Sequence, residues 1–449
     1  MLPEIDLLHR IGSLVRIPPA DDVPLSARVR RVLDTAPLRR LGSISQLGMV
    51  SLVYPGANHS RLEHTLGVYH NALRLLARFS ADDEFTSRID QPMAEAFVLA
   101  ALLHDVGHWP FCHPIEDMQL GEVGEHETRI ADVIDTCELG QCIEQDWLCN
   151  SQQVIDLLEP NGVADERATF AMSFLASCLS GPIDIDKLDY LQRDSLHAGV
   201  PYGSQFDIGR LISSVRINPQ SARLAIDEKG RTAAELMVFA RYVMFSEVYW
   251  HHAVRSATAM LQRSIFLLQN RVDLISTLRM TDAEWIAMLR RSAEGSVAEP
   301  LVEGLFGPTR NLYKRIAEFN VIDGGLVHQR LARKPYWWLV VCAERLAQHL
   351  TQVTGLAIHA ADILIDAPPV KLEVDINMDV IGRDGAVRTL GDVSAVASAL
   401  AERQFDDQVK SVRVFVRPDL RAALQSAMES EQWNEQLLIV SESLEQELV

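Results

Sequence analysis

The sequence predicts a mainly α-helical protein with a small α+β region at its C-terminal end. Three observations lead to this fold class. Most of residues 1–350 shows the spacing of apolar residues typical of helices, and alternating, strand-like runs come only after residue 360. No glycine or proline interrupts Ala233 to Gln269, which predicts one very long helix over residues 233–268. The chain of 449 residues is also too long for one small core.

Two helices of the N-terminal half follow directly from their patterns. Residues 93–104 are apolar on all sides, which predicts a buried central helix. Asp90 is expected to cap its N-terminus, and Pro92 suits the first turn. An amphipathic helix is expected after Ser60, because leucines recur there in steps of three, four and seven residues. These leucines are Leu62, Leu66, Leu73 and Leu76.

The strands are expected near the C-terminal end. Residues 363–365, 372–378 and 411–416 have the composition of strands, and residues 391–403 look helical. We therefore expect a helical domain over residues 1–350, with its core motifs at 34–265, and a small α+β region over 351–449.

The charge balance excludes some partners. The chain has 42 Lys and Arg against 61 Asp and Glu, a formal charge of −19. This disfavours a broad nucleic-acid surface and docking on anionic membranes. An anionic small molecule stays compatible, because a pocket needs only a few local cations.

The compartment is expected to be the cytoplasm. The N-terminus shows no secretory signal, and the apolar stretch Ala96 to Leu103 is far shorter than the roughly 20 residues that span a bilayer. The six cysteines contain no Cys-x-x-Cys pair and are most simply free thiols. A zinc site built from Cys137, Cys142 and Cys149 stays open as an alternative.

A set of imidazoles and carboxylates suggests a metal site: His64, the pair His104-Asp105, and Asp186. Such ligands suit a divalent ion, with Mn, Fe, Co, Zn, Ni or Mg as candidates. A structural hydrogen bond between His and Asp is the alternative. However, Gly107, His108 and His113 follow the pair directly, and burying so many polar groups costs several kcal/mol unless they bind something.

A second pattern lies around Asp186. Asp186, Tyr190 and Asp194 recur every four residues, so they form one column about 12 Å long on a helix face. Such a column suits a ligand with phosphate at one end and a sugar hydroxyl at the other, although a solvated charged face explains it equally well. Arg241 and Tyr249 are about 80° apart on the long helix, where an ordinary amphipathic helix explains them as well.

These motifs resemble the HD-domain phosphohydrolases, and more closely their deoxynucleoside triphosphate triphosphohydrolase branch, which includes the vertebrate sterile-alpha-motif/HD-domain protein. The resemblance covers roughly residues 28–265 and implies an HD-domain helical bundle. The matching segments are DTAPLRRLGSISQLG (34–48), YPGANHSRLEHTLGV (54–68), HDVGHWPFCH (104–113), HE (126–127), DIDKLDYLQRDS (184–195), PYGSQFDIGRLI (201–212), ARYVMFSEVYWHH (240–252) and, more weakly, DILIDAPP (362–369).

The resemblance also implies roles for individual residues. The metal would be bound by His64, His104, Asp105 and Asp186. The catalytic His would be His126, with Glu127 as its orienting partner and His108 near the phosphate. Three cations would hold the triphosphate: Arg61, Lys187 and Arg241. The sugar would be read by Tyr190 and Asp194, and the sugar and base pocket would be lined by Gln46, Leu47, Tyr249 and the neighbouring His113.

The chain also departs from the family at two positions. Gly42 stands where the vertebrate protein has Arg, which puts nucleotide activation of that type in doubt although Asp34 is retained. Phe245 stands where it has His, which bears on substrate choice.

The resemblance implies hydrolysis of a deoxynucleoside triphosphate (dNTP) to deoxynucleoside and triphosphate, by a homo-oligomer. The alternatives are an HD phosphodiesterase or nucleotidase acting on another nucleotide, and a nucleotide-sensing module with little turnover.

Overall fold

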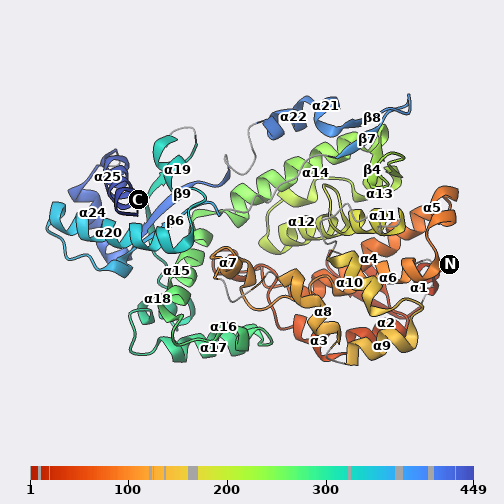
Figure 1. The fold of residues 1–449 in the computed structure, drawn as a ribbon, viewed down its shortest axis with the longest axis horizontal. Helices are drawn as coiled ribbons and strands as arrows, with labels where there is room; N and C mark the ends of the chain where they lie inside the picture. The colour runs from red at the N-terminus through yellow and green to blue at the C-terminus, as the bar shows by residue number, and fades with distance from the viewer. Residues whose placement is uncertain are drawn as a thin grey trace.

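The computed structural model describes the whole chain except residues 1, 9–11, 20, 121–123, 125, 136–137, 160–169, 322–324, 370–377, 403–408, 430 and 449, and only the backbone at 21, 127, 135, 401, 402 and 448. Helices dominate, and the described strands form three small sheets. Helices α1 to α14 make up one half of the molecule, against which β7, β8, α21 and α22 also lie, and α15 to α20, α24 and α25 form the other half (Figure 1). The mainly α-helical prediction is confirmed.

The first part of the chain builds the core under the candidate site. Its elements are α1 Pro3–Leu7, β1 Leu14–Ile17, β2 Asp21–Pro24, α2 Ala27–Leu33, α3 Ala36–Leu41, the 3-10 helix η1 Gly48–Leu52, α4 Arg61–Phe79, α5 Asp83–Arg88 and α6 Gln91–Leu103. Helix α6 is the expected buried helix: every residue from Ala96 to Leu103 is fully buried. Asp90 caps it by accepting a hydrogen bond from the Met93 amide, and Pro92 lies in its first turn. Helix α4 packs against α6 and against α12.

The next elements are α7 Cys112–Glu116, η2 His126–Arg129, α8 Ile130–Asp135, α9 Glu138–Asp146, α10 Ser151–Leu158, α11 Phe170–Leu179, α12 Ile185–Ala198, η3 Tyr202–Ser204, α13 Ile208–Ser214, β3 Val215–Ile217, β4 Leu224–Asp227 and η4 Glu228–Gly230. Helix α12 is capped by the Asp184 side chain at its start and by Gly199, in the left-handed region, at its end. These caps fix the two ends of the helix that carries the predicted column.

The single long helix predicted over residues 233–268 is wrong. The chain forms α14 Arg231–Met244, a π-helical turn at Phe245–Tyr249, and then α15 His252–Leu268. No glycine or proline marks this break, so its cause is tertiary. The Tyr249 hydroxyl donates to Asp194 (2.6 Å), and the Trp250 ring packs under the Arg255 guanidinium at 4.1 Å. A π-turn of this kind is common where a helix passes a functional site.

The last elements are α16 Leu274–Thr277, α17 Asp282–Ala293, α18 Glu299–Phe306, β5 Lys314–Phe319, α19 Gly325–Leu331, α20 Tyr336–Thr354, η6 Ala360–Asp362, β6 Ile363–Asp366, β7 Asp379–Ile381, β8 Val387–Thr389, α21 Leu390–Val393, α22 Ala395–Glu402, β9 Val412–Val416, α24 Pro418–Ala427 and α25 Gln432–Leu448. Strand β9 lies between β5 and β6 in an antiparallel sheet, and the other larger sheet has the order β3-β4-β7-β8. Both sheets therefore take strands from either side of residue 350, and the division of the chain there stays a prediction.

The strands predicted at 363–365 and 411–416 are confirmed as β6 and β9. The one predicted at 372–378 lies, apart from Met378, outside the described residues. The predicted helix at 391–403 is present as α21 and α22, with a break at Ser394. Within the described part of the chain, no helix is long and apolar enough to cross a bilayer.

Candidate active site

Four side chains from three helices meet at one point. His64 comes from α4, His104 and Asp105 from the end of α6, and Asp186 from the first turn of α12. His64 Nε2 lies 3.2 Å from His104 Nε2 and 3.0 Å from Asp186 Oδ1. His104 Nε2 lies 3.5 Å from Asp105 Oδ1. The structure thus brings together the whole predicted ligand set, and His64, His104 and Asp105 form a cluster able to hold a metal ion.

The outer nitrogens of both histidines are held by other groups. His64 Nδ1 lies 2.8 Å from Asp189 Oδ2, and His104 Nδ1 lies 3.0 Å from the Ala101 carbonyl oxygen. Each of these contacts directs the Nε2 atom of its ring toward the common point, as outer-shell partners do in metal sites. Burial opposes protonation of His64, but its contacts with Asp186 and Asp189 outweigh burial and raise its pKa to about 10. Carboxylates therefore flank His64, and the nitrogen and oxygen donors of the cluster fit a divalent cation.

Close packing around Asp189 depends on a glycine. Arg193 binds both oxygens of Asp189, at 2.8 and 2.7 Å. A Cβ atom at Gly67 would lie 1.8 Å from Asp189 Oδ1 and 2.5 Å from Arg193 Nη2. Only glycine at this position of α4 lets the ion pair reach His64.

A second group of imidazoles lies beside the cluster. The ring centroids of His108 and His126 are 3.7 Å apart. His126 Nδ1 lies 2.9 Å from Glu116 Oε1, while the side chain of Glu127, its predicted partner, is outside the described part of the structure. A Cβ at Gly107 would lie 2.2 Å from the His126 carbonyl oxygen, so only glycine at this position lets the His126 segment approach so closely.

The carboxyl groups here are held ionised. Burial opposes ionisation of Asp105, but His108 and Arg61 hold its pKa well below its usual range. Burial likewise opposes ionisation of Glu116, and His113 and His126 hold its pKa well below its usual range. For His108, burial and the nearby Arg61 lower the pKa well below 6.5, so this ring is neutral at pH 7.

The three predicted triphosphate-binding cations are buried or nearly so. Arg61 Nη1 lies 2.9 Å from Asp105 Oδ2, and Lys187 Nζ lies 2.5 Å from Asp184 Oδ2. Arg241 and Lys187 are close enough to each other for their charges to interact.

The predicted sugar-reading residues meet at the far end of α12. Asp194 accepts a hydrogen bond from Tyr249 and lies 3.0 Å from His59 Nε2. The Tyr190 hydroxyl is buried near Arg241 and Lys187. Gln46 Oε1 is buried, with no hydrogen-bond partner in the structure. A buried amide oxygen calls for a hydrogen-bond donor, which an ordered water or a ligand can supply.

The remaining two predicted pocket residues are placed differently. Leu47 is half-buried and packs against the cluster of apolar side chains that includes Leu188 and Val248. The His113 side chain is 60% exposed and stacks edge-on to His108 and His126 at 5.2 Å. His113 therefore lies with the imidazoles of His108 and His126.

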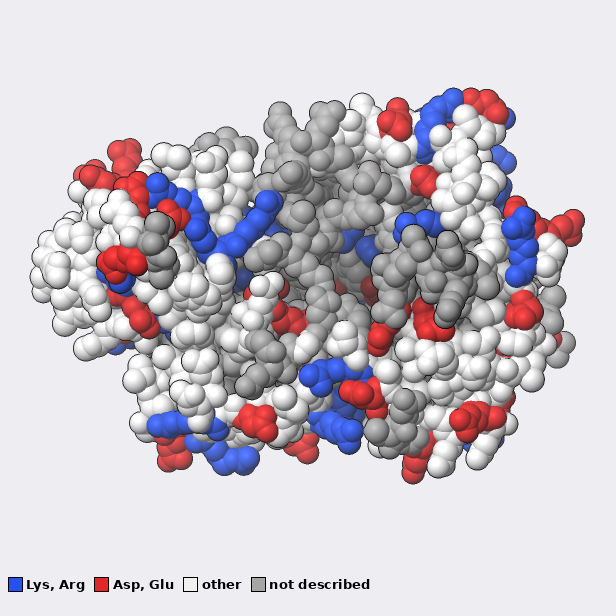
Figure 2. All heavy atoms as spheres, in the orientation of Figure 1, with Lys and Arg blue, Asp and Glu red and all other residues white. Residues whose placement is uncertain are grey.

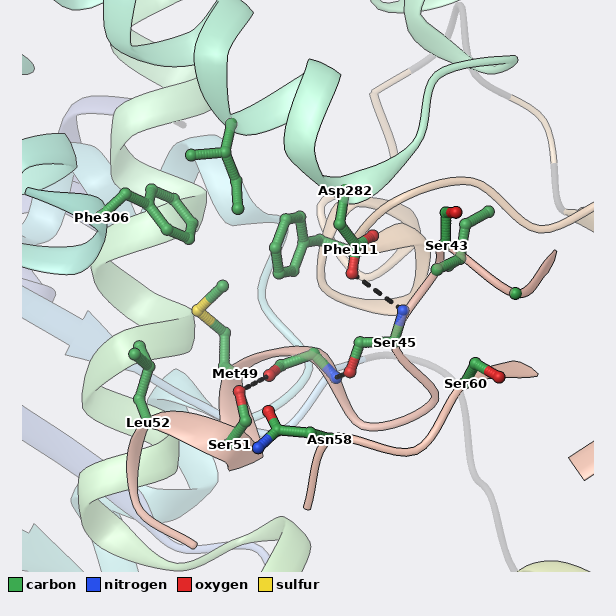
Figure 3. A pocket seen from close by; sticks show the side chains of 14 residues that line it. Ser43, Ser45, Met49, Ser51, Leu52, Asn58, Ser60, Phe111, Asp282 and Phe306 are labelled. Carbon is green, nitrogen blue, oxygen red and sulfur yellow. Dashed lines mark hydrogen bonds between the residues drawn. The ribbon is translucent and has the colours of Figure 1, made fainter. Parts of the chain in front are cut away.

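A cavity of about 360 Å³ lies beside the loop that carries Gln46 and Leu47, and neither residue lines it (Figure 3). Ser45 donates its amide hydrogen to Asp282 Oδ2 (2.8 Å), and the Gly48 amide donates to Ser45 Oγ (3.1 Å). Burial raises the pKa of Asp282. These two hydrogen bonds at the cavity wall hold the loop that carries Gln46 and Leu47.

Sequence reasoning did not single out the partners of the predicted site residues, which are His59, Glu116, Asp184 and Asp189, nor Arg193, which binds Asp189. Helical spacing offered a signal for three of them, since Asp189 and Arg193 are four residues apart and Glu116 follows His113 by three. For the alternative zinc site, Cys137 lies outside the described residues, and the metal-ligating clusters found among those described include neither Cys142 nor Cys149.

Comparisons with known proteins agree with this geometry. The model of the HD domain matches residues 61–147, and that of the HD associated region matches residues 206–431, half of the chain. An uncharacterized protein of Methanocaldococcus jannaschii is 28% identical over 383 residues, 84% of this chain and 74% of its own length. The deoxynucleoside triphosphate triphosphohydrolase SAMHD1 of Gallus gallus is 30% identical over 247 residues, 49% of this chain and 40% of its own length.

The fold recurs in solved structures. The crystal structure of a phosphohydrolase from Bacteroides thetaiotaomicron superposes with a TM-score of 0.67 at 22% identity, covering 90% of this chain and 100% of the other. The two family models show that the chain belongs to the HD-domain family and carries the HD associated region.

Proposed function

We propose that this protein hydrolyses deoxynucleoside triphosphates to deoxynucleoside and inorganic triphosphate. The observation that carries the proposal is the arrangement along α12, where Asp186 joins the metal cluster at one end and Asp194 meets Tyr249 at the other. Lys187 and Tyr190 lie between them. A nucleotide laid along this helix would have its phosphates at the cluster and its sugar at Asp194. The relatives named triphosphohydrolases support this substrate class.

The residues of the cluster would hold a divalent ion, which supplies Lewis-acid chemistry at the α-phosphate. His126 is the candidate proton donor to the leaving 5′-oxygen, or the group that positions the attacking water. Glu116 accepts from its Nδ1, so Nε2 faces the reacting atoms. In this mechanism Glu116 takes the orienting role predicted for Glu127.

Three cations would neutralise the triphosphate. Arg61 and Arg241 offer planar guanidinium groups that suit phosphate oxygens, and Lys187 adds a point charge. The carboxylates of Asp105 and Asp184 hold Arg61 and Lys187 in place.

Recognition of the sugar would fall to Tyr190 and Asp194. Tyr190 under the sugar would crowd a 2′-hydroxyl, and Asp194 would accept from the 3′-hydroxyl. A carboxylate has about four lone-pair sites, so contacts with His59 and Tyr249 still leave Asp194 acceptor capacity.

The test is product analysis. The purified protein is incubated with Mn²⁺ or Co²⁺ and with each dNTP, including dGTP, each ribonucleotide, nucleoside monophosphates and cyclic dinucleotides. The expected products are deoxynucleoside and triphosphate. Release of orthophosphate or pyrophosphate would contradict the proposal, and turnover confined to monophosphates or cyclic dinucleotides would favour a nucleotidase or phosphodiesterase. Tight binding without turnover under every metal would indicate a nucleotide sensor.

We further propose a cytoplasmic homo-oligomer without a broad nucleic-acid surface. On the face shown in Figure 2, the basic and acidic side chains of the described residues alternate in small groups. Light scattering of the purified protein tests the oligomer, and a monomer at micromolar concentration would contradict it.

A further inference from the structure

A second group of side chains able to bind a metal lies beside the cluster of His64, His104 and Asp105. It consists of His108, Cys112, His113 and His126. We refer to these four residues as the histidine–cysteine cluster. One ligand atom from each lies within 4.8 Å of the others. The proposed reaction does not use the sulfur of Cys112, so this donor atom is available for a further role.

Carboxylates hold the outer nitrogens of two of these imidazoles. Glu116 lies 2.9 Å from His126 Nδ1 and 3.4 Å from His113 Nδ1. Asp105 Oδ1 lies 3.1 Å from His108 Nδ1 but does not form a hydrogen bond with it. Carboxylate–imidazole pairs of this kind orient the second nitrogen of the ring and raise its basicity in metal sites. Glu116 therefore orients His113 and His126 in the way that Asp189 orients His64.

The thiol of Cys112 faces the cluster from α7. Cys112 is 1% exposed, and its Sγ lies 3.8 Å from His113 Nδ1 and 4.0 Å from Arg61 Nη2. The thiolate is the form of cysteine that binds metals. Sulfur and imidazole donors together select softer transition metals such as Zn²⁺ over Mg²⁺.

We propose that the histidine–cysteine cluster is a second cation site, which takes Zn²⁺ and thereby inhibits hydrolysis. On binding, the Cys112 thiol loses its proton to solvent and a metal–sulfur bond forms. Occupation also takes the Nε2 lone pair of His126, so this ring no longer transfers a proton. The inhibition rests on the proposed function, whereas the binding site does not.

The geometry permits this with a small movement. A tetrahedral zinc ion, with bonds of about 2.0 to 2.3 Å, holds its donor atoms roughly 3.5 Å apart. The donor atoms of the cluster lie within 4.8 Å of one another, so they have to close by roughly 1.3 Å at most. The His113 side chain is 60% exposed, so it is not packed on every side.

Cobalt titration tests the site directly, because thiolate-bound Co²⁺ has a charge-transfer band in the near ultraviolet. The wild-type protein should bind two Co²⁺ per chain, and one of them should produce this band. In Cys112→Ser the band should vanish and one ion should remain, whereas in His104→Ala the band should persist. Cys142→Ser is the matched control, since Cys142 lies outside both clusters, and should keep the band. Absence of the band in the wild type, or its survival in Cys112→Ser, would overturn the proposal.

The inhibitory role has its own measurement. With hydrolysis supported by Mn²⁺, added Zn²⁺ should inhibit the wild type, and Cys112→Ser should need at least about tenfold more Zn²⁺, since even an outer-shell change weakens metal binding 10- to 100-fold. Equal inhibition of both proteins would refute the inhibitory role. If no substrate is turned over at all, the proposed function fails. The cobalt spectra then still show whether the histidine–cysteine cluster binds a metal.

Discussion

Asp189 lies directly behind His64, with its Oδ2 atom 2.8 Å from His64 Nδ1, on the side of the ring that faces away from the metal cluster. The metal ligand is therefore positioned by a residue of α12 that itself takes no part in the predicted ligand set. Because Arg193 binds the same carboxylate through two hydrogen bonds, α4 and α12 are locked together at the site.

Changing Asp189 should weaken metal binding without removing a ligand. Asp189→Asn keeps the size of the side chain but lowers its ability to orient His64, so affinity for Mn²⁺ should fall about 10- to 100-fold. Isothermal titration measures this, and circular dichroism checks that the helices persist. Asp384→Asn, at an exposed position, serves as the control and should bind as the wild type does. Unchanged affinity in Asp189→Asn would contradict the role of Asp189.

Replacing Gly67 should disturb the contact between Asp189 and His64, because a side chain at this position would collide with Asp189. A Cβ at this position meets Asp189 and Arg193 at distances that no packed structure tolerates, so Gly67→Ala should lose about 1–3 kcal/mol of stability. Metal affinity should fall as well. Gly325→Ala is the matched helical control, because a Cβ there meets nothing within 4 Å. Urea unfolding measures the stability of both variants. Equal free energies of unfolding for Gly67→Ala and Gly325→Ala would contradict the packing argument.

Glu116 and Glu127 are the two candidate partners of His126. Glu116 contacts its Nδ1, so Glu116→Gln should lower kcat about 100-fold with little change in KM, because proton transfer depends on the orientation and charge of this pair. Glu127→Gln is the comparison variant and should have the smaller effect. Steady-state kinetics on the preferred dNTP measures both, and the reverse order would return the orienting role to Glu127.

A buried ion pair far from the site should make stability depend on pH. Glu4 is fully buried and accepts hydrogen bonds from Arg28 at 2.8 and 2.7 Å and from Ser26 at 2.6 Å. Burial raises the pKa of Glu4, but the hydrogen bonds from Arg28 and Ser26 outweigh burial and lower it below 4.5. A carboxyl with a lowered folded pKa stabilises the fold above its unfolded pKa, and this stabilisation is lost as pH falls through the folded value.

Glu4→Gln should therefore cost about 3 kcal/mol at pH 7, and this cost should shrink as the pH falls below 4.5. Urea unfolding of wild type and variant at pH 7 and at about pH 3.5 measures the difference. Glu431→Gln, at an exposed position, should change stability little at either pH. A difference that is the same at both pH values would contradict the assignment.

Helical periodicity and capping identified much of the fold. The buried helix α6 and its Asp90 cap, the strands β6 and β9, and the predominance of helix could all be predicted, because these signals depend on near neighbours in the chain. The π-turn at Phe245–Tyr249 could not, since its contacts with Asp194 and Arg255 come from distant segments or from beyond the break.

The same division holds for the candidate site. The sequence alone determined which residues can bind a metal, because His64, His104, Asp105 and Asp186 stand in recognisable motifs with the right donor atoms. Only the tertiary structure decided which residues orient them. Asp189 against His64, Glu116 against His126 and Gly67 under the Arg193 pair are contacts between elements, set by how closely α4, α7 and α12 approach. Periodicity shows the face on which a side chain lies, whereas its partner depends on the packing of a second helix against that face.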